Sequence, residues 1–209
     1  MIALIDYRAG NLTSVKKALA ALEADVFVPA APGDLARAAG LIVPGVGHFG
    51  ATTALDSGWR RAILDRLGHG RPLLGICLGM QWLFEGSDEA PDCPGLGLVS
   101  GRCYRLLGTS DGACGSRDLP RVKVPHVGWN ALSVCRSDSI VSGIDTGAQV
   151  YFTHSYVAPR GGDTVAVAEH GEIFAAVMQQ GQVAGLQFHP EKSGEVGLRF
   201  LRNFLERTG

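Results

Sequence analysis

The sequence has little that would bind a membrane or a nucleic acid, because it lacks both long apolar runs and an excess of one charge. No stretch approaches the ~20 consecutive apolar residues that a membrane-spanning helix needs. The apolar residues 1–5 are followed at once by Asp6, which is too early for a signal peptide. The formal net charge is −1, so there is no electrostatic reason to expect binding to nucleic acid or to an anionic membrane.

The sequence also lacks a pairing pattern among its cysteines. There are five, an odd number, and no two are spaced as Cys-x-x-Cys. This spacing argues against a disulfide framework and against a zinc site, and it favours a reducing compartment. We therefore expect a cytoplasmic protein without a bound metal or other cofactor.

The first half of the chain alternates short apolar runs with segments of helical periodicity. Apolar runs of this kind are typical of buried parallel strands, and the helices between them pack on the two faces of the sheet. The pattern predicts a three-layer, open, mainly parallel α/β sheet. The expected strands are 2–5, 26–28, 41–43 and 71–74, and the expected helices are 12–22, with Asn11 as its cap, 34–38 and 58–67.

The second half predicts an antiparallel extension of this sheet. Two strand pieces are expected within 95–107, a polar glycine-rich loop at 108–119, and a closing amphipathic helix at 195–206. Four more strand-like runs, with turn residues between them, occupy 148–157, 163–169, 172–178 and 183–188. Because the sequence shows no linker and no internal repeat, we expect residues 1–209 to form one domain.

The segment 75–81, Gly-Ile-Cys-Leu-Gly-Met-Gln, places Cys77 on the turn between an apolar strand and a helix with one apolar face. A nucleophile flanked two residues away by glycines is the nucleophile-elbow pattern, here with sulfur instead of oxygen. A Cβ at Gly75 or Gly79 would collide with the neighbouring helix or strand. A lone cysteine is more often buried and inert, but the flanking glycines favour Cys77 as the nucleophile.

A thiolate nucleophile also needs a base and a group that orients it. His189 follows the apolar run 183–188 directly, and Glu191 lies two residues further on. In an extended segment these two side chains point the same way, with Pro190 preventing a helix from starting. His69 and His170 are expected at the surface. The other three histidines, His48, His126 and His154, lie in loop-like motifs and are candidates to line a site, but none has a carboxylate two residues away.

Acyl transfer further needs hydrogen-bond donors for the oxyanion that forms on the substrate. The N–H of Leu78, directly after Cys77, is one candidate. The other is the N–H of Val46, because the glycines on either side of it allow the backbone to turn that group inward. The same freedom predicts that this donor need not point inward in the free protein, so that the isolated chain is nearly inactive.

The motifs 44–47 (Pro-Gly-Val-Gly), 75–81 and 189–191 (His-Pro-Glu) together resemble those of the class I glutamine amidotransferases, which use a Cys-His-Glu triad. Within that family the chain is most similar to the glutaminase subunits of imidazole glycerol phosphate synthase. The segments that carry this resemblance are 11–12, 44–49, 75–81, 125–130, 151–156 and 187–194. Departures from the family pattern occur at Arg8, Ala9 and Val127.

The resemblance implies that Cys77 attacks the side-chain amide of glutamine while His189, oriented by Glu191, transfers protons. It implies a (β/α)8-barrel cyclase as the partner, which receives the ammonia, forms a heterodimer with this chain and acts in histidine biosynthesis. The triad spans residues 77–191, which leaves no second domain to bind an ammonia acceptor. Substrate binding is implied for Gly47, Gln81, Ser155 and Tyr156, and partner contact or gating for Asn11, Trp129, Tyr151 and Lys192.

Three alternatives remain open at this point. The first is a glutaminase subunit of another pathway, such as pyridoxal phosphate or anthranilate synthase, which the segments 125–130 and 192–194 disfavour. The second is a cysteine peptidase or chaperone-like protein of the same architecture, which Gln81 disfavours. The third is a catalytically silent module, which an intact triad disfavours.

Overall fold

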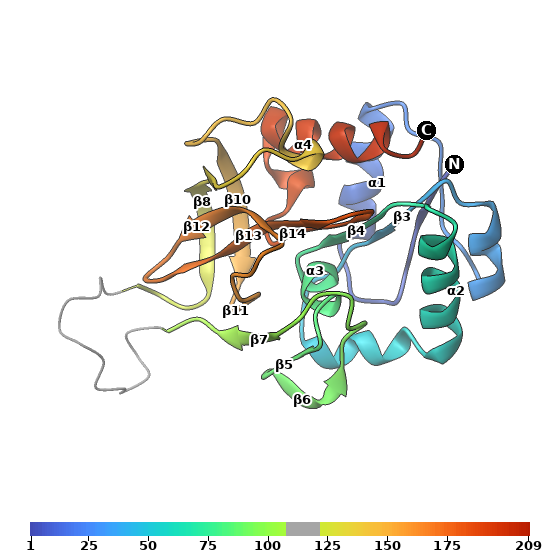
Figure 1. Ribbon diagram of the computed structural model, residues 1–209, viewed down its shortest axis with the longest axis horizontal. Coiled ribbons are helices and arrows are strands. Elements are labelled where there is room, and N and C mark those ends of the chain that lie inside the picture. The colour runs from blue at the N-terminus through green and yellow to red at the C-terminus, as the bar shows by residue number, and fades with distance from the viewer. Residues whose placement is uncertain (108–121) are drawn as a thin grey trace.

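The computed structural model describes residues 1–107 and 122–209, and an eight-stranded sheet forms its centre (Figure 1). The strand order is β2-β1-β3-β4-β14-β13-β12-β9. From β2 to β14 neighbouring strands pair in parallel: β2 (Val26–Phe27), β1 (Ile2–Leu4), β3 (Gly40–Val43), β4 (Leu73–Ile76) and β14 (Val183–Leu186). Antiparallel pairing then adds β13 (Ile173–Gln180), β12 (Thr164–Glu169) and β9 (Ser133–Val134). The predicted parallel sheet with an antiparallel extension is confirmed.

Helices cover both faces of the sheet, as the alternating pattern predicts. Side chains of successive strand residues point to opposite faces, so Leu4 and Ala3 belong to different cores. The first core packs against α1 (Leu12–Ala21) and α4 (Gly194–Glu206), and the second packs against α2 (Ser57–Gly68) and the 3-10 helices η1 (Pro32–Arg37) and η2 (Phe49–Ala54). On α4, Phe200, Leu201 and Phe204 are fully buried, as the amphipathic pattern of 195–206 predicts.

Two small sheets lie beside the large one. One pairs β8 (His126–Ala131) with β10 (Gln149–His154), and the other has the order β11-β7-β5-β6. Its strands are β11 (Tyr156–Val157), β7 (Arg102–Arg105), β5 (Gly86–Ser87) and β6 (Ala90–Pro94). The prediction that 148–157 extends the main sheet is therefore wrong. The strand is interrupted at Ser155, and the two strands on either side of that residue pair in different small sheets.

Three local predictions also need correction. Only one strand lies within 95–107, while β5 and β6 precede it in a polar stretch that has no strand-like alternation. The helix after Cys77, α3 (Leu78–Trp82), has no exposed face, because the main sheet, η2 and β5 pack around its five residues. The short helix expected at 34–38 is η1. The predicted loop 108–119 lies outside the described residues.

Two further 3-10 turns, η3 (Ser139–Val141) and η4 (Pro190–Lys192), complete the elements of the described residues. None of the helices in 1–107 or 122–209 is both long enough and apolar enough to cross a membrane.

Candidate active site

The carboxyl ends of neighbouring parallel strands bring the predicted catalytic residues together. Cys77 follows β4 directly, and His189 follows β14, the strand paired with β4. Ile76 lies opposite Leu186 in the register, and the Cys77 N–H donates to the Leu186 carbonyl at 2.7 Å. Ligand sites in open α/β sheets form at this edge, so the topology places the site where the sequence predicts it.

The backbone at Cys77 has the strained geometry of a nucleophile elbow. Its φ of 50° and ψ of −105° lie outside the regions that an L-residue normally occupies. A Cβ at Gly75 would lie 2.6 Å from the carbonyl oxygen of Gly79, and a Cβ at Gly79 would lie 1.8 Å from that of Val43. The predicted collisions are confirmed, and they show why only glycine allows α3 to pack this closely.

His189 and Glu191 form a buried pair. Nδ1 of His189 lies 2.8 Å from Oε1 of Glu191, and both side chains are fully buried. The contact is made across a tight 3-10 turn that begins at Pro190, and not along an extended segment as the sequence predicts. Proline is well suited to the first position of such a turn, because an N–H at that position would have no partner within the turn.

The side chain of Asn11 completes this pair. Its amide nitrogen donates to Oε1 of Glu191 and lies 3.4 Å from Nδ1 of His189. Asn11 precedes α1 in a left-handed conformation, but its side chain makes no capping hydrogen bond. The prediction that Asn11 caps this helix through its side chain is therefore wrong, because the amide is turned toward Glu191 instead.

The surroundings of His189 favour its protonated form. Burial alone would lower the pKa of His189, but the neighbouring Cys77 and Glu191 outweigh it and raise the pKa above its usual value. Nε2 of His189 makes no hydrogen bond in the part of the chain that the structure describes, whereas Nδ1 is held by Glu191. The arrangement suits an imidazolium paired with a thiolate.

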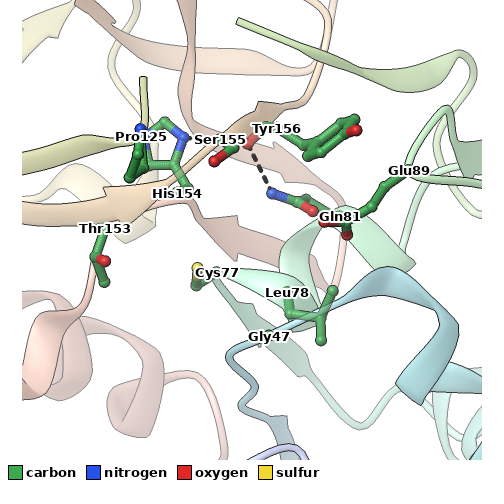
Figure 2. A pocket seen from close by; sticks show the side chains of 10 residues that line it. All are labelled: Gly47, Cys77, Leu78, Gln81, Glu89, Pro125, Thr153, His154, Ser155 and Tyr156. Carbon is green, nitrogen blue, oxygen red and sulfur yellow. Dashed lines mark hydrogen bonds between the residues drawn. The ribbon is translucent and has the colours of Figure 1, made fainter. Parts of the chain in front are cut away.

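A cavity of about 210 Å³ opens beside Cys77 (Figure 2). All four residues predicted to bind substrate line it, namely Gly47, Gln81, Ser155 and Tyr156, and Leu78 and His154 lie with them. Glu89 also lines the cavity, a residue that sequence reasoning missed. The only sign of Glu89 in the sequence is that a carboxylate occurs in the polar hairpin after the elbow helix. In the structure, Oε2 of Glu89 accepts from the N–H of Phe49 at 2.6 Å.

Both predicted oxyanion donors are bound to the chain itself. The N–H of Val46 donates to the carbonyl of Ala9 at 2.7 Å, and the N–H of Leu78 donates to the carbonyl of Gly45 at 3.2 Å. The Gly45 carbonyl and the Val46 N–H belong to one peptide group. The orientation of this one peptide group therefore affects both donors. Its carbonyl accepts the hydrogen of Leu78, and its own N–H is directed to Ala9 and not to Cys77.

The predicted partner-contact residues fall into two places. Trp129 and Tyr151 meet edge to face with ring centroids 6.1 Å apart, and Nζ of Lys192 lies 5.6 Å from the Tyr151 ring. The exposed fractions of Trp129 and of its neighbour Val127 are 57% and 56%, so an aromatic and apolar patch faces solvent. Asn11 does not join this patch, because its side chain contacts the buried Glu191.

One prediction about histidines is wrong. His126 and His154 lie on strands β8 and β10 and are buried, whereas the sequence places them in loops. His170 is half-buried and stacks on His126 with ring centroids 4.0 Å apart. Within the described part of the chain, no three His, Cys, Asp or Glu residues are placed to hold a metal ion.

The fold and the elbow define an α/β protein of the triad type, and comparison with known families agrees. The family described as glutamine amidotransferase class-I matches residues 3–208. The chain therefore belongs to the class I glutamine amidotransferases. A crystal structure titled glutamine amidotransferase aligns over 100% of both chains with a TM-score of 0.73 at 22% identity. PurLQS from Thermotoga maritima aligns over 98% of this chain and 97% of that one with a TM-score of 0.69 at 19% identity. At such identities these two structures support the fold alone.

Relatives at higher identity narrow the family. Imidazole glycerol phosphate synthase subunit HisH of Halobacterium salinarum is 45% identical over 98% of this chain and 92% of its own length. The HisH subunit of Methanothermobacter thermautotrophicus is 41% identical over 99% and 98%, and that of a Geobacillus species is 43% identical over 98% and 95%. Within the class I glutamine amidotransferases, the chain thus belongs to the HisH subunits of imidazole glycerol phosphate synthase.

Proposed function

We propose that this chain hydrolyses glutamine to glutamate and ammonia through Cys77, His189 and Glu191, and passes the ammonia to a cyclase subunit. One observation carries the proposal: a strained cysteine elbow opens into a cavity beside a buried His–Glu pair. The nucleophile thus lines an amino-acid-sized cavity, and a buried base that is held by a carboxylate lies near it, as covalent catalysis requires.

The reaction follows from these positions. The Cys77 thiolate attacks the side-chain carbonyl carbon of glutamine, and the negative charge that develops on the oxygen is stabilised by the N–H groups of Leu78 and Val46. His189 gives its proton to the leaving nitrogen, so that ammonia departs and a thioester remains. His189 then takes a proton from water, which attacks the thioester and releases glutamate. Glu191 holds the imidazole in position throughout.

The cavity offers groups for the rest of the substrate. Free glutamine carries an ammonium and a carboxylate on its α-carbon, and a site for it needs opposite charge or hydrogen bonds for each. The Glu89 carboxylate, half-buried in the cavity wall, suits the ammonium. The backbone at Gly47 and at Ser155, together with the Gln81 side chain, suits the α-carboxylate and the amide.

Rotation of the peptide group between Gly45 and Val46 would switch the site on. It would release Leu78 from the Gly45 carbonyl and turn the Val46 N–H away from Ala9 toward Cys77. A partner that binds over this edge of the sheet can shift the population toward the rotated state. Hydrolysis without an acceptor for the ammonia is thereby kept slow.

The partner is proposed to be the (β/α)8-barrel cyclase of imidazole glycerol phosphate synthase, a step of histidine biosynthesis, in a heterodimer. The patch formed by Trp129, Tyr151 and Lys192 is the proposed contact surface, because exposed aromatic rings are enriched at protein interfaces.

The test is a glutaminase assay with the isolated chain and with a cyclase subunit of this family added. Glutamate should form rapidly only in the mixture, and imidazole glycerol phosphate should form when the cyclase substrate is supplied. The Cys77→Ala chain, which keeps the fold and the patch, is the matched control. A mixture that binds tightly but hydrolyses no glutamine would refute the proposal.

A further inference from the structure

A buried amide faces the sulfur of Cys77 from the strand side. Nε2 of Gln187 donates to Sγ of Cys77 at 3.7 Å, and Oε1 of Gln187 accepts from Nε2 of Gln81 at 3.2 Å. The Gln187 side chain has no exposed surface. It lies outside the triad, and the mechanism above does not use it.

The orientation of this amide is fixed by a group that can only accept. The carbonyl of Tyr156 takes a hydrogen bond from Nε2 of Gln81 at 2.8 Å and lies 3.1 Å from Nδ1 of His154. Gln81 must therefore present its NH₂ group to the carbonyl, and the same NH₂ reaches Oε1 of Gln187. With its oxygen held there, Gln187 has only its N–H groups left to face the sulfur.

The same carbonyl orders a pair of imidazoles behind it. Because Nδ1 of His154 must donate to Tyr156, Nε2 of His154 is the acceptor, and it lies 3.1 Å from Nδ1 of His126. Nδ1 of His126 then carries the hydrogen, which leaves Nε2 of His126 to accept from the Asn130 amide at 3.3 Å. In this series of hydrogen bonds, the assignment of donor and acceptor at each group is consistent with that of its neighbours.

The far end of the chain is anchored in strand β8. The Asn130 amide nitrogen donates to the carbonyl of Glu169 at 2.8 Å, and its oxygen accepts from the N–H of Ala131 at 2.8 Å. Asn130 follows Trp129 of the exposed patch directly. Burial, followed by the neighbouring His170, lowers the pKa of His126 to about 4, so the ring is neutral, as its double role requires.

We propose that Gln187 is a further catalytic residue, one that hydrogen-bonds the Cys77 thiolate, and that Asn130, His126 and His154 are positioning residues for it. An N–H aimed at a sulfur favours the anionic form and restricts the directions in which that sulfur can move. The buried chain then links strand β8 to the reacting atom. The inference rests on the proposed function, because it assigns Gln187 a part in the same thiolate chemistry.

Two measurements on Gln187→Met test whether Gln187 acts on the Cys77 thiolate. The rate of Cys77 alkylation by iodoacetamide is followed against pH, and kcat is measured for glutamine hydrolysis with the cyclase. Loss of a hydrogen bond to a charged group should raise the pH midpoint of alkylation by about one unit and lower kcat about tenfold. Gln179→Met is the matched control, because Gln179 is a buried, hydrogen-bonded glutamine of β13 whose partners are Ser139 and Ile140.

Two variants of His126 test whether this residue positions Gln187. The amide of asparagine can place an N–H where Nδ1 of histidine stands, whereas phenylalanine cannot. His126→Asn should therefore keep the alkylation midpoint and kcat close to wild type, and His126→Phe should shift both in the direction of Gln187→Met. Thermal unfolding is recorded for each variant. If Gln187→Met does not fold, Gln187→Glu replaces it and should raise the midpoint further, because a carboxylate repels the thiolate.

The inference is overturned if Gln187→Met and Gln179→Met have the same midpoint and kcat, or if the two His126 variants behave alike. Failure of the proposed function is a different result. In that case the wild-type chain with the cyclase hydrolyses no glutamine, while the alkylation midpoints still report whether Gln187 acts on the sulfur.

Discussion

The peptide group between Gly45 and Val46 should limit glutamine hydrolysis in the isolated chain. Its rotation breaks two hydrogen bonds, Val46 N–H to Ala9 at 2.7 Å and Leu78 N–H to Gly45 at 3.2 Å. Each has a net value of about 1 kcal/mol, so the rotated state lies about 2 kcal/mol higher and is populated roughly one part in thirty. Almost all free molecules then lack both oxyanion donors.

The expected activation by the cyclase follows from these values. If the partner moves every molecule into the rotated state, turnover rises by at most about 30-fold, because the roughly one part in thirty that is already rotated sets the basal rate. The unrotated molecules add little to that basal rate, since a missing oxyanion donor costs about 10²–10³ in rate. The gain should appear mainly in kcat, since the cavity walls that bind glutamine are already formed. Steady-state glutaminase rates are measured for the isolated chain, then with the cyclase, then with its nucleotide substrate as well, and should climb at each step.

A backbone change separates the peptide group from other routes of activation. Replacing the N–H of Val46 with an ester oxygen by semisynthesis removes the donor without changing the side chain, and should lower the activated kcat by about 10²–10³. The same replacement at Ala51, whose N–H donates to His48 within η2, is the control. Full activity of the isolated chain, or an activated rate that the Val46 ester does not alter, would refute the reasoning.

Three further outcomes are expected at single residues. A diazo-ketone analogue of glutamine should label Cys77 one to one, and Cys77→Ala should abolish hydrolysis; mass spectrometry that finds the label on another cysteine contradicts the assignment. His189→Asn should lower kcat by several orders of magnitude. Glu191→Gln should lower it by less, because the amide oxygen of glutamine still accepts a hydrogen bond from the His189 ring. Equal losses of kcat in the two variants would mean that the charge of Glu191, and not its orientation of the ring, is what matters. The free energy of unfolding should fall as the pH drops from 6.5 toward 4. Burial and His170 lower the pKa of His126 to about 4, so in this range the unfolded chain binds a proton that the folded chain does not. The unfolding temperature of His126→Asn should therefore depend less on pH in this range.

The parts of the site that the sequence predicts well are those fixed by short-range sterics. The glycine spacing around Cys77 specifies the elbow, because a Cβ at Gly79 would lie 1.8 Å from a carbonyl of the next strand. The pairing of His189 with Glu191 needs only two residues of separation. The alternation of apolar strands and helices fixes the parallel sheet, and the sheet then brings the ends of β4 and β14 together.

The parts that could not be predicted depend on contacts between distant segments. Glu89 reaches the cavity only because a polar hairpin folds back beside α3, and a polar hairpin has no hydrophobic periodicity to reveal it. The sequence places His126 and His154 in loops because their strands, β8 and β10, form only by pairing between segments about twenty residues apart. The direction of the Gly45 carbonyl has no sequence signal at all, because glycines allow both orientations.

The loop between β1 and α1 connects the two halves of the site. Through the Ala9 carbonyl it holds the Val46 N–H away from the sulfur, and through the Asn11 amide it holds Glu191 against His189. Both contacts come from one short loop, in which Arg8 and Asn11 have a positive φ near 65°. A partner that displaces this loop would therefore be expected to act on the oxyanion donor and on the base together.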